Sequence, residues 1–117
     1  MELRDIVHAL LKGDLLAARQ WVADARRERI QWERIDRPQG LTDRELTVAA
    51  AVVELLATRA EESPPSWADA VGAQEEPLLL DPGLEEMPRS LAHAKAFAPE
   101  PLRKRNLVAL PDFLDVA

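Results

Sequence analysis

The sequence predicts a mainly α protein: three N-terminal helices form a small bundle, and a Pro-rich irregular half with short helical turns wraps the core. Aliphatic residues recur every three or four positions in the first half, which gives each helix an apolar face. Eight of the nine prolines follow Glu62 and disfavour long helices there. Large apolar residues nevertheless continue through the second half, unlike in most disordered segments. We therefore predict a single domain over residues 1–117, with a helical part at 1–62 and an extended wrap at 63–117.

Two helices are expected before residue 38. Apolar residues at positions 3–11 lie on one helical face, Gly13 is suited to end that helix, and Asp14 can cap the next one. If the second helix continues past residue 29, Trp21 and Trp32 lie about three turns apart and share a face.

The third helix has the clearest start signal. Thr42 and Glu45 form a capping-box pattern, in which each side chain can bond the other residue's backbone amide. The run LTVAAAVVELLA that follows is apolar on most of its circumference, so we expect it to be central in the bundle or covered by another chain. A homodimer through this helix is compatible with the pattern. The run is too short to cross a bilayer.

The second half is expected to be mostly irregular, with two helical turns over Ser90–Phe97. Its last segment, PEPLRKRNLVALPDFLDVA, joins a cationic cluster at Arg103–Arg105 to an apolar run. We predict that this segment is ordered, with its apolar side chains docked and the cations facing a carboxylate-bearing surface. Truncation after Pro101 should then damage solubility or partner binding.

Histidine, serine and glycine do not occur in this sequence at the spacings of known catalytic or phosphate-binding motifs. His8 and His93 are isolated from each other, there is no cysteine, and no serine stands in a GxSxG elbow. The four glycines do not cluster as phosphate-binding loops require. Adjacent glutamates in the Pro-rich half are typical of solvated charge. We predict no enzyme, no catalytic residue, no cofactor and no metal site.

Composition also bears on location and partners. The absence of cysteine and of a signal-peptide core favours a cytoplasmic protein that is not inserted in a membrane. A net charge of −6 disfavours a generic nucleic-acid binder, whose affinity comes from lysine and arginine.

The pattern that remains is typical of a protein–protein interaction module. Tryptophan and arginine are enriched at interface hot spots, and apolar anchors are abundant here. The candidate partner-binding residues are Trp21, Trp32, Trp67, Leu102, Arg103, Lys104, Arg105, Phe113 and Leu114.

The alternative is a small DNA-binding transcriptional autoregulator that uses the second helix. That helix carries Arg19, Arg26, Arg27 and Arg29, but Asp24 and Glu28 interleave with them. Alternating charge is typical of a solvated helix face.

Three stretches together resemble a group of small uncharacterised bacterial proteins. They are residues 37–68, with a Pro–Gly–Leu helix entry and a PPxW step, residues 75–94, and a PxPLRxRN tail at 99–117. Members of this group are encoded beside nucleotidyltransferase-like proteins in a toxin–antitoxin-like pairing. The resemblance implies a non-enzymatic, antitoxin-like partner of such an enzyme, with no catalytic residues to carry over. The matching positions are Trp67, Pro101, Leu102, Arg103, Arg105, Asn106, Phe113 and Leu114.

Overall fold

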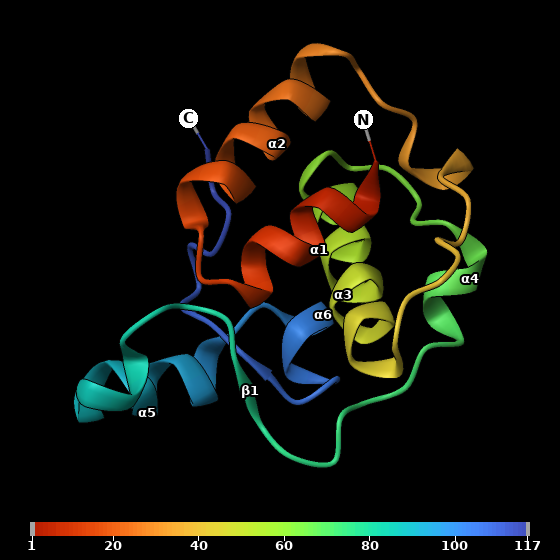
Figure 1. The fold of residues 1–117 in the computed structure, drawn as a ribbon. Helices are drawn as coiled ribbons and strands as arrows, with labels where there is room; N and C mark the ends of the chain where they lie inside the picture. The colour runs from red at the N-terminus through yellow and green to blue at the C-terminus, as the bar shows by residue number, and fades with distance from the viewer. Residues whose placement is uncertain (1, 117) are drawn as a thin grey trace.

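The computed structural model describes residues 2–116 and is mainly helical, which confirms the predicted class (Figure 1). In chain order the elements are α1 (Leu3–Leu11), α2 (Leu15–Arg27), the 3₁₀ turn η1 (Trp32–Arg34), α3 (Asp43–Arg59), α4 (Ser66–Asp69), β1 (Leu78–Leu79), the 3₁₀ turn η2 (Leu84–Glu86), α5 (Pro88–Phe97), α6 (Glu100–Arg103) and β2 (Leu107–Val108).

The turn between α1 and α2 is made by the two residues that the sequence singles out. Gly13 has a φ of +76°, which a residue without a side chain adopts at little cost. The carboxylate of Asp14 accepts a 3.0 Å hydrogen bond from the backbone amide of Ala17 and caps α2.

The second helix ends at Arg27 and does not continue to Trp32. Arg29 adopts a left-handed conformation with φ of +52°, and the chain turns there toward η1. Trp21 and Trp32 still meet, with their ring centroids 6.3 Å apart, because η1 brings Trp32 back beside α2.

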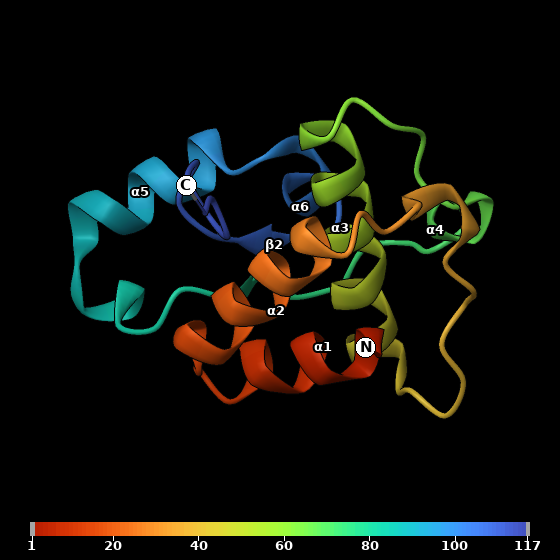
Figure 2. The same ribbon diagram turned by 90° about the horizontal axis from the view of Figure 1, so that it is seen from above.

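Helix α3 is the central element, and its predicted capping box is confirmed. Thr42 accepts a hydrogen bond from the amide of Glu45, and Glu45 accepts one from the amide of Thr42. Every residue from Thr47 to Ala57 is buried, and α1, α4, α6 and η1 all pack against the helix (Figure 2). The apolar side chains of α3 between Thr47 and Ala57 are therefore covered within this chain.

The C-terminal segment completes the core. Strands β1 and β2 pair in parallel, with Leu78 opposite Leu107 and Leu79 opposite Val108. Helix α6 lies on α3. The buried apolar residues of this segment are Leu102, Leu107, Val108, Ala109, Phe113 and Leu114.

Helix α5 stands apart from this body. It packs against η2 and β2 and projects away from α1, α2 and α3 (Figures 1 and 2). Within residues 2–116, no helix has the length and apolar character needed to span a membrane.

Candidate functional site

More than half of the predicted partner-binding residues lie in the chain's own core. They are Trp32, Leu102, Arg105, Phe113 and Leu114, each at most 4% exposed. In this conformation these side chains offer no surface to a partner.

The other two tryptophans are half-buried and held by hydrogen bonds. The indole N–H of Trp21 donates to the carbonyl oxygen of Glu2 at 3.0 Å, and that of Trp67 donates to the carbonyl of Ile35 at 2.8 Å. These bonds tie distant segments together, so each ring has a structural role already.

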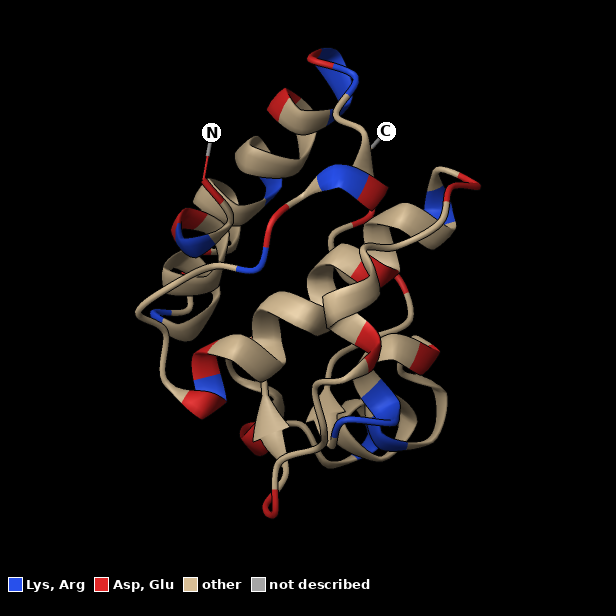
Figure 3. Cartoon of the chain, turned by 90° about the vertical axis from the view of Figure 1, so that its right-hand side faces the viewer, with Lys and Arg blue, Asp and Glu red and all other residues tan. Residues whose placement is uncertain are grey.

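Two members of the cationic cluster, Lys104 and Arg105, contact the same carboxylate. Arg105 is buried, and its guanidinium donates to Glu54 Oε1 at 2.5 Å and to the carbonyls of Ala68 and Pro101 at 2.8 and 2.9 Å. Lys104 reaches the other oxygen of Glu54 at 2.8 Å. The carboxylate that this cluster faces therefore belongs to α3 of the same chain. Figure 3 shows α3 as a largely uncharged stretch between its charged ends.

Glu54 is held ionised by this arrangement. Burial alone would raise the pKa of Glu54, but the hydrogen bonds and charges of Arg105 and Lys104 outweigh it and lower that pKa below the ordinary value.

Two of the three large exposed apolar side chains of the described chain lie at the two ends of α5, Met87 at its N-cap and Phe97 as its last residue. Met87 and Phe97 are 45% and 60% exposed, and the third, Leu16, is on α2. Within α5 only Ala94 is buried, against Leu84 and Val108 in a small satellite core. We call η2 and α5, residues 84–97, the α5 arm.

The outward face of the α5 arm is continuous. Ala92, His93, Ala96 and Phe97 are all exposed and follow helical spacing, and the His93 and Phe97 rings lie 5.0 Å apart. Arg103 joins this surface, because its guanidinium donates to the carbonyl of Ala96 at 3.2 Å.

The charge of this surface differs from that of the rest of the chain. Within the α5 arm, Arg89 and Lys95 on α5 are balanced by the exposed Glu85 and Glu86 of η2, so the arm is formally neutral, whereas the whole protein has a net charge of −6. Helix α5 itself contains the two cations and no acid.

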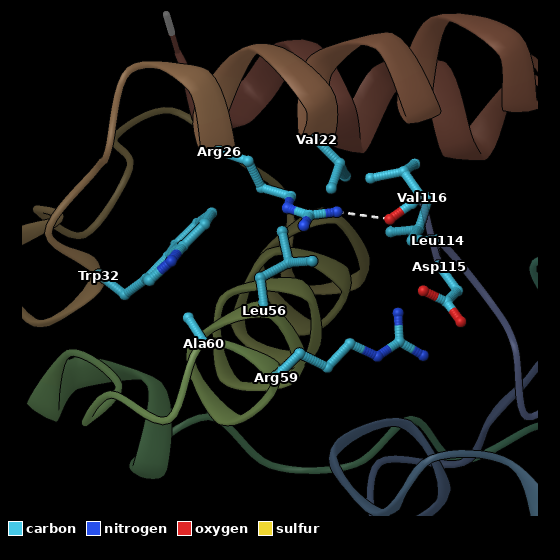
Figure 4. Close-up of a pocket in the computed structure, with 9 residues that line it drawn as sticks. All are labelled: Val22, Arg26, Trp32, Leu56, Arg59, Ala60, Leu114, Asp115 and Val116. Carbon is cyan, nitrogen blue, oxygen red and sulfur yellow. Dashed lines mark hydrogen bonds between the residues drawn. The ribbon is translucent and has the colours of Figure 1, made fainter.

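A pocket of about 450 Å³ lies between α2, α3 and the C-terminal segment (Figure 4). Its apolar lining comes mainly from Val22, Trp32, Leu56 and Leu114. Two guanidinium groups reach into it, from Arg26 on α2 and Arg59 on α3. This pocket shares no residue with the α5 arm.

The remaining polar candidates form contacts within the chain. His8 on α1 lies 2.9 Å from a carboxylate oxygen of Glu45, and Arg27 forms an ion pair with Asp24 one turn earlier on α2. In the part of the chain that the structure describes, no three His, Cys, Asp or Glu side chains gather as a metal site would require.

Sequence reasoning did not select the α5 arm or the pocket. Nothing in the local sequence distinguishes Phe97, which is exposed, from Phe113, which is buried. Arg26 looked like part of a solvated charged face, and Arg59 stands out only when α3 is placed beside the C-terminal segment.

The chain matches no protein-family model, and no curated protein or solved structure shows significant similarity to it.

Proposed function

We propose that the protein is a non-enzymatic protein-binding module and that the α5 arm is the surface that engages its partner. The observation that carries this proposal is the exposure of Phe97 on a projecting helix whose outer face is largely apolar. Clustered exposed apolar side chains are typical of interaction surfaces, and aromatic anchors contribute most of the affinity at many of them.

The chemistry of the arm indicates the kind of partner. An exposed helix face with apolar positions at helical spacing suits a hydrophobic groove on another protein. Arg89 and Lys95 lie on α5 and Arg103 contacts it, so acidic groups on the partner would complement the α5 end of the arm, and basic groups would complement Glu85 and Glu86 at its η2 end.

The concrete version of the proposal is an antitoxin-like role. The resemblance of residues 37–68, 75–94 and 99–117 to small proteins encoded beside nucleotidyltransferase-like proteins supports a cognate enzyme of that type as the partner. Binding would restrain the enzyme sterically, since the arm offers an anchor and no catalytic group.

The proposal predicts that a nucleotidyltransferase-like enzyme is encoded beside the gene of this protein, and the test mixes the two purified proteins. We expect a stoichiometric complex by calorimetry and loss of nucleotidyl transfer when the two are mixed. Phe97→Ser should weaken binding at least tenfold, as for an interface hot spot. Leu16→Ser, at the other large exposed side chain outside the arm, should change it less than twofold.

Two outcomes contradict the proposal. One is the absence of a complex with that enzyme, and the other is an affinity of the Phe97→Ser protein equal to that of the wild type. A mobility shift of the gene's own upstream DNA, with steep salt dependence, would instead support the autoregulator alternative.

A further inference from the structure

We propose that the pocket between α2, α3 and the C-terminal segment binds a small monocarboxylate with an apolar body. This site is independent of the proposed partner binding at the α5 arm. The lining of this site is apolar and also includes two cationic groups from different helices.

The dimensions and walls of the pocket suit a small organic molecule. A volume of about 450 Å³ lies within the usual range for ligand pockets, roughly 300–1,000 Å³. Trp32 and Leu56 line the pocket, and Val22 lies above Leu56 on α2 (Figure 4). Such walls bury an aliphatic or aromatic body but cannot pair a charge.

The charged part of the lining is held in place by the backbone. Arg59 donates to the carbonyls of Phe113 and Pro111 at 2.5 and 3.3 Å, and Arg26 donates to the carbonyl of Val116. Both guanidiniums are thereby directed toward the C-terminal segment from opposite sides of Leu56 (Figure 4). Groups fixed in this way lose little conformational entropy when a ligand binds.

These guanidiniums retain hydrogen-bonding capacity. A guanidinium has five N–H donors, and the bonds to the described residues use only part of them. Within residues 2–116, neither Arg26 nor Arg59 has a carboxylate within 4 Å, although Asp115 also lines the pocket.

The net charge of the pocket lining favours a carboxylate as the ligand. Two arginines and one aspartate give the lining a net charge of +1, which a carboxylate neutralises and a phosphate dianion would exceed. A carboxylate also offers two coplanar oxygens, which match the fork of a guanidinium. Burial lowers the pKa of Arg59, while Asp115 and Asp112 oppose this effect. Arginine remains charged in proteins, so the site is cationic at neutral pH.

The test uses 3-phenylpropanoate as the probe and 3-phenylpropanamide as its uncharged match. In nitrogen-15 NMR spectra, the acid should shift the indole resonance of Trp32 saturably and leave that of Trp67, outside the pocket, in place. We expect the acid to bind at least tenfold more tightly than the amide.

Substitutions of single arginines test whether the acid binds in the pocket. Arg26→Gln and Arg59→Gln should each weaken binding of the acid at least tenfold. Arg27→Gln, one residue away and outside the pocket, should change it less than twofold. If loss of the Arg59 hydrogen bonds unfolds the chain, Arg26→Gln decides the question, since that residue has one bond to the described chain.

Three results would overturn the proposal: no saturable shift of the Trp32 resonance, equal affinity for the acid and the amide, or equal weakening by Arg27→Gln and Arg26→Gln. The last would indicate general attraction of anions to the surface of α2.

Discussion

At the scale of single residues, the three consecutive cations of the tail have different degrees of exposure although their charges are the same. Arg103 ends α6 and contacts the arm, Lys104 is half-exposed, and Arg105 is buried. The left-handed conformation of Asn106, with φ of +63°, turns the chain directly after Arg105 into β2. The side chain of Arg105 then lies between α3 and the α4 region, where Glu54 and backbone carbonyls satisfy it.

We expect Arg105→Met to lower the free energy of unfolding by about 3 kcal/mol, because it leaves Oε1 of the Glu54 carboxylate and the buried carbonyls of Ala68 and Pro101 without their donor. Urea denaturation measures the change. Lys104→Met, which removes the more exposed partner of Glu54, should cost less than about 1 kcal/mol.

Combining Arg105→Met with Glu54→Leu should recover more than half of the loss, since the double variant no longer buries a carboxylate that has lost its buried partner. Equal destabilisation by Arg105→Met and Lys104→Met would contradict this account of the cluster.

The carboxylate of Glu54 should also make the free energy of unfolding depend on pH. Because the folded state lowers the pKa of Glu54, its contribution to stability is present above the unfolded pKa, about 4.3, and is lost as the pH falls through the folded value. We therefore expect the free energy of unfolding to fall on acidification below about pH 4.5. In the Glu54→Gln variant, the free energy of unfolding should change less over the same pH range.

Asp81 acts in the opposite direction and provides a control. Burial raises the pKa of Asp81, although a 2.6 Å hydrogen bond from the amide of Leu110 opposes the shift. A raised carboxyl pKa adds stability as the pH falls. Asp81→Asn should therefore make the acid-induced loss steeper, and a flatter profile in that variant would contradict the assignment.

At the scale of elements, the start of α3 is the feature most open to a local test. Thr42→Ala removes the side-chain acceptor of the capping box and should cost about 1 kcal/mol of unfolding free energy. Thr58→Ala, at an exposed position in the last turn of the same helix, should cost less than about 0.5 kcal/mol. Equal effects in urea denaturation would mean that the cap does not stabilise the helix.

Elements whose signals are local could be predicted from the sequence. The Gly13 turn and the caps at Asp14 and Thr42 each depend on residues within about four positions. The end of α2 at Arg27 could not be predicted in this way, since residues 28–37 contain no glycine or proline. The packing of Trp32 in the core requires a reversal there that only tertiary contacts explain.

The candidate sites were beyond sequence reasoning for a related reason. Arg105 and Glu54 are 51 positions apart, and the pocket is assembled from α2, α3 and the last residues of the described chain. Which phenylalanine is exposed also depends on this assembly. Periodicity identifies apolar faces, but it does not say which of them another segment covers.

At the scale of the whole molecule, the C-terminal segment is part of the core that the N-terminal helices share. A chain ending at Pro101 lacks Leu102, Arg105, Phe113 and Leu114, all buried against the helical part or in contact with it. We expect this truncated protein to lose its cooperative urea transition and its near-ultraviolet circular dichroism.

A chain ending at Asp115 is the matched control and should keep both signals, since among the described residues it loses only the half-buried Val116. A cooperative transition in the shorter chain would show that the helices form a core without the tail.

The burial of α3 beneath α6 also sets an order of events during synthesis. More than forty residues separate the end of α3 at Arg59 from Leu102, so a ribosome makes the central helix well before it makes the segment that covers it. Until then the apolar surface of α3 is exposed to solvent and to other nascent chains, a state that favours aggregation. Folding of this protein is therefore expected to finish late in translation, and its yield in cells should respond to chaperones that bind apolar segments on emerging chains.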